Sequence, residues 1–382
     1  MTPENGGKGI RDGHIGLLEA TAMMTVFAIT KTFLAGPERM AKGGETAAWA
    51  VSLISGALSI LWLWPLVTVL KAYPGKDLIG ITRELAGKTV SLILGAVGSI
   101  VALGLVAVFV SELSDALSGV VLPKTPLMIT QILMFTVALF CAGHGLEVMG
   151  RLSVVGALVV TISILGLAIA SMNHWDWDSI FPLLGPGALN LAKVSLVRQT
   201  GYLEIFSLAI IAPFIRRKQD VSGSAWWALA VSAVVLCLSV LTCQMIFPFP
   251  SLSSVQIPFL RVARIVYINR FLQRFDVLFV LMWLTAGVWS IGFGIWVASV
   301  GLASSLSMNT YKPLLLPVGA AAFVATSLTP NVSTAIILEY DIIRPCSIVV
   351  LYLWPYLVLA LHLIKTKNKS ARSGNWEKGD PR

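Results

Sequence analysis

Hydrophobic residues form ten long runs along the chain, separated by short polar segments. A transmembrane helix needs about 20 apolar residues, whereas a barrel strand needs about 10 residues of alternating character. The runs are long and do not alternate, so the pattern predicts an all-α integral membrane protein with ten transmembrane helices. They cover about residues 15–37, 47–69, 89–117, 126–143, 150–172, 188–215, 224–248, 275–304, 311–329 and 344–364.

Composition supports this class of protein. Of the 382 residues, 56% are hydrophobic and 12% are charged, whereas soluble proteins contain about 25% charged residues. The net charge of +9 does not indicate nucleic-acid binding, because the basic residues lie between the runs and form no stripe with interleaved aromatic residues. The four cysteines have no metal-type spacing. We therefore expect no nucleic acid, metal or cofactor.

The distribution of Lys and Arg predicts the orientation in the membrane. Roughly twice as many of these residues lie on the side that carries both termini as on the other side, and the side richer in them is cytoplasmic. We expect residues 1–14 to be a cytoplasmic N-terminal segment, residues 15–364 to be the membrane domain, and residues 365–382 to be a cytoplasmic, disordered polar tail.

One loop on the outer side is itself basic. It contains Arg261, Arg264, Arg270 and Arg274 at spacings of three to six residues. Such spacing predicts an amphipathic helix over Pro258–Asp276 that lies on the outer face of the membrane.

The first hydrophobic run carries an ionisable residue. Lys31 lies between two threonines, Thr30 and Thr32, and a charged group inside hydrocarbon is by default a functional-site hypothesis. Two interpretations stay open. The long side chain extends to the membrane surface near Pro37, or its ammonium group binds a buried partner or a ligand.

The sixth run carries a second ionisable residue, Glu204, near its middle. A charged residue there costs about 3 kcal/mol unless a partner or water compensates. The preceding residues 199–202, Gln-Thr-Gly-Tyr, are typical of an interrupted helix that lines a cavity. Because runs 1 and 6 begin two halves of five runs each, paired interruptions point to a binding site at the membrane midplane. Glu204 could instead be only a structural partner of Arg198 or Lys31.

Other ionisable residues lie closer to the ends of their runs. For Glu19, Glu112, Asp115 and Lys193 we expect interfacial positions. Gly292-Phe293-Gly294 lacks the strand and the third glycine of a nucleotide site, and the four histidines are scattered at run ends. The sequence predicts no catalytic residue and no enzyme.

Four segments identify a family resemblance. They are residues 71–78 (KAYPGKDL), 122–127 (LPKTPL), 145–152 (GLEVMGRL) and 271–279 (FLQRFDVLF). Together they resemble the spore germination B subunits, the membrane subunits of nutrient germinant receptors, within the amino acid, polyamine and organocation transporter superfamily. The resemblance covers about residues 15–364. It implies a leucine-transporter-like fold with inverted repeats at about residues 15–172 and 188–364, and interrupted helices 1 and 6. It also implies assembly with A and C subunits in the spore inner membrane.

The chain departs from this family at two positions. Thr30-Lys31-Thr32 replaces a glycine-containing break, so helix 1 is expected to be less unwound, and Ser290 stands in span 8 where many members have a basic residue. One hypothesis joins the two departures: Lys31 supplies the cation of the core, in place of a coupling ion or of the charge in span 8.

The resemblance and the polar breaks together predict a membrane subunit that binds a small nutrient, an amino acid, between spans 1, 3, 6 and 8 and triggers germination by changing conformation. An amino acid permease or proton-coupled exchanger is the alternative, and a structural scaffold with a vestigial pocket is a second one. The expected ligand-binding residues are Phe27, Thr30, Lys31, Thr32, Thr200, Gly201, Tyr202 and Glu204.

Overall fold

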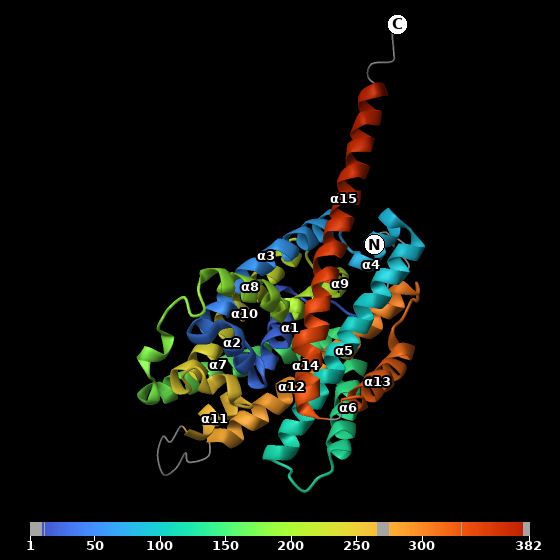
Figure 1. Cartoon of the computed structure of the whole chain (residues 1–382). Coiled ribbons are helices and arrows are strands. Elements are labelled where there is room, and N and C mark those ends of the chain that lie inside the picture. The colour runs from blue at the N-terminus through green and yellow to red at the C-terminus, as the bar shows by residue number, and fades with distance from the viewer. Residues whose placement is uncertain (1–9, 11, 266–274, 330, 377–382) are drawn as a thin grey trace.

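The structure, a computed structural model, describes residues 10, 12–265, 275–329 and 331–376, and the named elements of these residues are all helical (Figure 1). The α-helices are α1 (Leu17–Ile29), α2 (Gly36–Gly44), α3 (Ala48–Ala72), α4 (Leu78–Ala86), α5 (Lys88–Val120), α6 (Leu127–Gly143), α7 (Leu146–Ser171), α8 (Ala188–Arg198), α9 (Leu208–Ile211), α10 (Asp220–Ile246), α11 (Pro258–Ile265), α12 (Phe275–Ser305), α13 (Lys312–Ser327), α14 (Val332–Ile337) and α15 (Arg344–Trp376). Short 3₁₀ segments cover Thr30–Phe33, Glu45–Ala47, Met172–His174, Trp177–Ile180, Gln199–Ser207, Ala212–Phe214 and Ser251–Ser254, and a π-helical segment covers Leu338–Ile343.

Seven helical stretches of the described residues are long and apolar enough to cross a membrane. Large apolar side chains on α5, α6 and α7 point outward, where they fit contact with lipid; Ile100, Phe140 and Ile169 are each 68% exposed. Because α6 and α13 are shorter and the first run is interrupted after α1, the count of ten crossings stays a prediction. The seven stretches are Gly36–Ala72, Lys88–Gly119, Leu146–His174, Ala188–Phe214, Asp220–Ile246, Phe279–Ser305 and Val332–Lys367.

The first hydrophobic run is broken at its lysine. After α1 the chain forms the 3₁₀ segment Thr30–Phe33 and then enters α2. The Thr30 hydroxyl donates to the Val26 carbonyl (2.5 Å), and bonds of this kind compete with the helical ladder. Pro37 lies in the first turn of α2, where its missing N–H costs nothing. The predicted interruption is therefore present without a glycine at its centre.

The sixth run is broken where its polar residues gather. The 3₁₀ segment Gln199–Ser207 separates α8 from α9. The Thr200 hydroxyl donates to the Val197 carbonyl (2.9 Å), and the Gln199 amide donates to the Leu196 carbonyl (2.8 Å). These bonds turn the last carbonyls of α8 toward side chains and end its regular hydrogen-bond pattern.

A third break was not predicted. Between α14 and α15 the chain forms the π-helical segment Leu338–Ile343, which buries Glu339 and Tyr340. Such segments are frequent at functional sites. No predicted apolar run covers these residues, which lie between the last two runs.

The packing brings the broken segments together. Helix α1 packs on α7 and α10, while α12 packs on α5 and α6. Residues 199–207 contact α1, α3 and α15, and the π-helical segment contacts α5. Segments far apart in the sequence thus meet in the middle of the bundle (Figure 1).

The predicted amphipathic helix is present over its described part. Helix α11 buries Phe259, Leu260 and Val262 and exposes Arg261 and Arg264, as an amphipathic helix does. Residues 266–274 of the predicted helix, including Arg270 and Arg274, lie outside the described residues, and its last two residues, Phe275 and Asp276, begin α12.

The first described residues, from Ile10, and the C-terminal part of α15 lie at one end of the bundle, beside α4, and we call this the terminal end (Figure 1). Helix α15 continues to Trp376 and projects beyond the other helices there, whereas the sequence analysis expects a disordered tail from residue 365. Lys, Ala and Arg are good helix formers, and the first glycine after Lys365 is Gly374. Lys365 also forms an ion pair with Glu84 (3.1 Å).

Candidate functional site

Lys31 and Glu204 meet at the two predicted breaks. The Lys31 ammonium group forms an ion pair with Oε2 of Glu204 (2.9 Å) and also donates to the Gly201 carbonyl. The two residues are only 6% and 7% exposed, respectively. The side chain of Lys31 therefore binds a buried partner and does not extend to the membrane surface.

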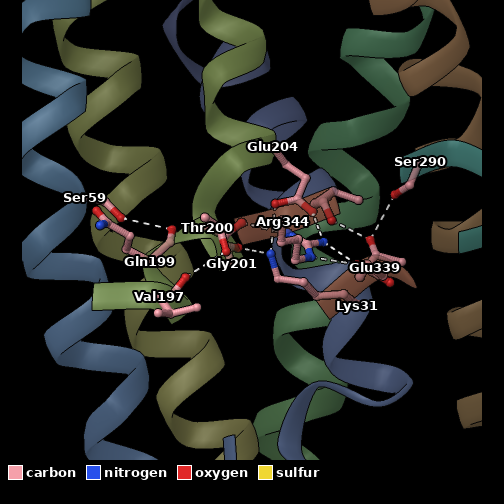
Figure 2. Close-up of polar contacts among 12 residues, drawn as sticks. Lys31, Ser59, Val197, Gln199, Thr200, Gly201, Glu204, Ser290, Glu339 and Arg344 are labelled. Carbon is pink, nitrogen blue, oxygen red and sulfur yellow. Dashed lines mark hydrogen bonds and ion pairs between the residues drawn. The ribbon is translucent and has the colours of Figure 1, made fainter. Parts of the chain in front are cut away.

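A third charged residue completes this cluster. Arg344, at the start of α15, donates to Oε1 of Glu204 (2.7 Å), to Oε1 of Glu339 (2.5 and 2.8 Å) and to the Thr200 carbonyl (2.7 Å). Glu204 thus bridges two cations, one with each carboxylate oxygen, as Figure 2 shows. We call Lys31, Glu204, Glu339 and Arg344 the ion-pair cluster.

The composition of the ion-pair cluster explains how it exists inside the bundle. Two cations face two carboxylates, so the cluster is neutral as a whole. Removing one partner of a buried pair typically costs about 3–5 kcal/mol, because it leaves an uncompensated charge. The cluster joins Thr30–Phe33, Gln199–Ser207 and the junction of Leu338–Ile343 with α15.

Sequence reasoning missed Arg344 and Glu339. The sequence analysis gave neither residue a role; Arg344 begins the last apolar run, and Glu339 lies just before it. The available signal was three ionisable residues, Glu339, Asp341 and Arg344, just before that run. The alternative to a ligand role made Glu204 a structural partner of Arg198 or Lys31, and the structure shows the pair with Lys31.

Glu112 corrects another prediction. It was expected near the membrane interface, but it is 2% exposed. The end of α5 is not open to solvent at this point, because α14 and the π-helical segment pack against α5.

Two of the predicted hydroxyl groups, those of Thr30 and Thr200, form hydrogen bonds with the protein itself. The Thr30 hydroxyl contacts the Ser290 hydroxyl (3.0 Å) in addition to its bond to Val26, and the Thr200 hydroxyl is bonded to Val197. Phe27 packs edge-on against Phe293, with ring centroids 5.2 Å apart.

Tyr202 lies apart from the other predicted residues. Its hydroxyl donates to the Ser52 carbonyl of α3 (2.7 Å). It is fully buried, packs beside Gly56 and lines none of the cavities described next.

Three small cavities adjoin the ion-pair cluster. The first, about 20 Å³, is lined by Thr32, Thr200, Gly201 and Arg198 together with Lys31 and Arg344, and we call it the threonine cavity. The second, about 30 Å³, touches Phe27, Ser290 and the whole ion-pair cluster. The third, about 70 Å³, is mostly apolar and reaches Glu204. A cavity needs roughly 10–15 Å³ to hold one water, so the site is nearly closed.

The end of the bundle opposite the termini is sealed by charged and aromatic groups. Arg39 of α2 forms an ion pair with Asp341 (3.2 Å). Arg39, Arg198 and Arg344 each place a guanidinium group over the Tyr340 ring, 5.5 to 5.7 Å from its centroid. Cation–π contacts of this kind are worth about 0.5–2 kcal/mol each. We call this group the Tyr340 seal.

The terminal end is hollow by contrast. A cavity of about 660 Å³ lies there, with Asp12, His14, Lys76, Asp77 and Arg83 among its lining residues. Burial raises the pKa of the Asp77 carboxyl, although a hydrogen bond from the Gly80 N–H (2.7 Å) opposes this effect. This cavity shares no lining residue with the three small cavities beside the ion-pair cluster.

Comparisons with known proteins agree with this architecture. A family model described as "Spore germination protein" matches residues 14–335. Spore germination protein KB of Bacillus subtilis (strain 168) is 21% identical over 311 residues, which cover 80% of this chain and 82% of the relative. Spore germination protein B2 of the same strain is 22% identical over 274 residues, which cover 69% and 73%.

A solved structure shows the fold. It is a nucleobase-cation-symport-1 family transporter in a closed conformation with bromovinylhydantoin bound. It matches with a TM-score of 0.65 at 11% identity and covers 90% of this chain and 80% of the transporter. The chain therefore has the predicted leucine-transporter-like fold. The names of these proteins describe germination and transport, not catalysis.

Proposed function

Because the chain belongs to the spore germination protein family, we propose that it is the membrane subunit of a nutrient germinant receptor that binds a small nutrient, an amino acid, at its broken helices. In this proposal it assembles with A and C subunits in the spore inner membrane, with the terminal end in the cytoplasm. Lys31, Thr32, Thr200 and Gly201 form the ligand site, and Phe27 and Glu204 adjoin it.

One observation carries the proposal: Glu204 bridges Lys31 and Arg344 beside the threonine cavity. An amino acid carries an ammonium group and a carboxylate group. In this proposal its ammonium group competes with Lys31 or Arg344 for Glu204, and its carboxylate competes with Glu204 for these two cations. The cluster connects three broken segments, so a ligand that rearranges it moves those segments relative to one another. Binding thereby shifts a conformational equilibrium, which is the event a receptor must report.

The small size of the threonine cavity fits this role. At about 20 Å³ it accommodates water but no amino acid, so ligand binding requires the cavity to expand. A ligand that binds the expanded state better than the closed one stabilises it by that difference in affinity. In this proposal the structure, with its threonine cavity of about 20 Å³, is the closed member of this equilibrium.

A glycine substitution tests the site directly. A Cβ atom on Gly201 would lie 3.9 Å from Nζ of Lys31 and from Cε of Met40, which is ordinary contact. Gly201→Ala therefore adds a methyl group to the threonine cavity without a clash. Gly156→Ala is the matched control, because its added Cβ would lie 4.0 Å from Val26, in α7 and away from the threonine cavity.

The experiment measures germination of spores that carry each variant against a panel of amino acids. We expect Gly201→Ala to raise the half-maximal nutrient concentration about tenfold, which corresponds to about 1.4 kcal/mol of binding free energy. We expect Gly156→Ala to leave it unchanged. Equal dose responses at equal protein levels would refute the proposed site and would favour a scaffold with a vestigial pocket.

An amino acid permease is the second candidate. It is favoured by the transporter fold and by the cavity of about 660 Å³ at the terminal end, which is large enough to admit a small solute. Uptake of labelled amino acids by vesicles that contain the chain alone would support the permease. Uptake absent without partner subunits, together with a nutrient response in spores, would support the receptor.

A further inference from the structure

The threonine cavity is lined by three cations. Lys31, Arg198 and Arg344 contribute to its wall, whereas no aspartate or glutamate of the described residues does. A carboxylate forms its strongest hydrogen bonds with such groups. In the proposed site the carboxylate of an amino acid therefore lies at these cations, and its side chain points toward the remaining lining residues.

Four of the remaining lining residues form a largely apolar wall. Leu236 and Val240 lie one turn apart on α10, and Met40 belongs to α2. Ser52 of α3 completes this wall, since α3 and α10 pack against each other. All four side chains are buried. We call these residues the Ser52 wall, and Ser52 supplies its polar group.

The Ser52 hydroxyl is fully buried and has no hydrogen-bond partner among the described residues. Serines inside helices commonly donate to a carbonyl of their own helix. Ser59 of α3 does so with the Ser55 carbonyl (2.9 Å), and Ser239 of α10 does so with the Val235 carbonyl (2.8 Å). A buried hydroxyl without a partner costs free energy. The Ser52 hydroxyl is therefore a polar group that a ligand in the threonine cavity can satisfy.

The backbone of Ser52 is tied to the broken segment Gln199–Ser207. The Tyr202 hydroxyl donates to the Ser52 carbonyl (2.7 Å). The Tyr202 hydroxyl also lies close to Gly56, one turn further along α3, where a Cβ atom would be only 3.2 Å from it. Because Tyr202 directly follows Gly201, this contact fixes Ser52 relative to the segment that holds the proposed ligand.

We propose that Ser52 is a specificity-determining residue of the ligand site, and that the nutrient is an amino acid with a short side chain that carries a hydroxyl group. The carbon atoms of that side chain pack against Met40, Leu236 and Val240, and its hydroxyl bonds to Oγ of Ser52. This inference rests on the proposed function, because it assigns the side chain of the ligand within the same site.

The chemistry of the Ser52 wall favours a hydroxyl over other groups. An amide side chain carries two donors and an acceptor and needs several partners, whereas this wall offers one hydroxyl. An aliphatic side chain leaves the Ser52 hydroxyl unpaired in the complex. Sites built to bond a hydroxyl of the substrate reject analogues that lack it.

Threonine and valine test this assignment, because they have nearly the same shape and differ by a hydroxyl in place of a methyl group. Spores with the wild-type chain should respond to threonine at a half-maximal concentration about tenfold lower than to valine, a factor that corresponds to about 1.4 kcal/mol. Ser52→Ala should bring the two concentrations to about the same value. Its melting temperature should not fall, because the hydroxyl has no partner to lose among the described residues.

Ser224→Ala is the matched control. Ser224 is buried in α10, its hydroxyl donates to the Val221 carbonyl (3.1 Å), and it does not line the threonine cavity. This variant should keep the wild-type ratio of threonine to valine. A ratio that falls in Ser52→Ala and stays constant in Ser224→Ala supports the inference.

Gly201→Ala separates this inference from the proposed site itself. If Gly201→Ala weakens the nutrient response but Ser52→Ala keeps the wild-type ratio, the ligand lies in the threonine cavity and the role of Ser52 is overturned. Wild-type spores that do not prefer threonine to valine, or that respond to neither, overturn it as well. If Gly201→Ala leaves the response unchanged, the proposed site is refuted, and the role of Ser52 with it.

Discussion

Lys31 and Glu204 lie 173 positions apart in the sequence and form a buried ion pair of 2.9 Å. Each comes from a segment where a helix is interrupted, so this pair fixes the two breaks against each other. The lysine that departs from the family pattern is therefore a structural part of the same core that holds the proposed ligand site.

Lys31→Met should lower the free energy of unfolding by about 1–3 kcal/mol, because Glu204 then keeps Arg344 but loses one of its two cations. It should also change the nutrient response. Thermal unfolding in detergent and the germination dose response are the measurements. Lys42→Met is the control. The Lys42 side chain, which pairs with Glu38, is 45% exposed, and ion pairs with an exposed partner contribute about 0–1 kcal/mol to stability. Normal stability and an unchanged response would exclude a role for Lys31 as the core cation.

Arg344→Gln should destabilise the protein more strongly, by about 3–5 kcal/mol, because Glu204 and Glu339 both lose this cation. Arg344→Lys should recover only part of the loss, since an ammonium group cannot reproduce the forked bonds to two carboxylates and a carbonyl. Membrane protein level and thermal unfolding measure both effects. The control is Arg151→Gln. The Arg151 side chain, which pairs with Glu147, is 73% exposed, so this change should leave the protein level and the stability nearly unchanged. An Arg344→Gln protein as stable as this control would contradict the assignment.

Opening the Tyr340 seal should expose the threonine cavity. Asp341→Asn removes the ion-pair partner of Arg39. A cysteine introduced at Thr32 then measures how well a reagent in solution reaches the threonine cavity. All variants in this test carry serine in place of the four native cysteines, Cys141, Cys237, Cys243 and Cys346, so that the reagent labels only the introduced cysteine. Labelling of the new cysteine by a membrane-impermeant thiol reagent should rise several-fold in Asp341→Asn. It should not rise in Asp178→Asn, which changes an exposed carboxylate elsewhere. Equal labelling in both would mean that another element seals this end.

Glu84, at the terminal end, should make the free energy of unfolding depend on pH. Hydrogen bonds from Lys76 and Lys365 hold the pKa of this carboxyl below its usual value of 4.5. The folded state therefore binds the proton less tightly than the unfolded state. The stabilisation is present above pH 4.5 and is lost as the pH falls through the lower folded-state pKa.

Glu84→Gln should remove this dependence. At pH 7 the loss should be below about 1 kcal/mol, because the groups are partly exposed and screened. Melting temperatures of wild type and Glu84→Gln between pH 7 and pH 3 provide the measurement. Parallel curves over that range would show that Glu84 does not titrate as its contacts require.

The sequence was informative where polar residues interrupt an apolar run. Lys31 between two threonines, and Gln199 to Glu204, stand out because hydrocarbon does not tolerate them without partners. They identified both breaks and half of the ion-pair cluster. The leucine-transporter-like fold followed from the family resemblance.

Residues at the ends of runs were harder to interpret, because sequence does not give depth in the membrane. Glu112 and Arg344 could each have been interfacial. Glu112 is buried because α14 and the π-helical segment pack against α5, and Arg344 is buried in its ion pairs with Glu204 and Glu339. Tyr202 was assigned to the ligand site by its neighbours in sequence. In a 3₁₀ segment successive side chains point in different directions, so Tyr202 faces α3 while Gly201 faces Lys31.

The central claim is that a nutrient binds beside the Lys31–Glu204 pair. The most direct test is equilibrium binding of a radiolabelled amino acid, chosen as the most potent in the germination panel, to the purified receptor. We predict saturable binding to wild type, at least tenfold weaker binding to Gly201→Ala and wild-type affinity for Gly156→Ala. Equal affinity for all three proteins, or no binding to the wild type, would contradict the account.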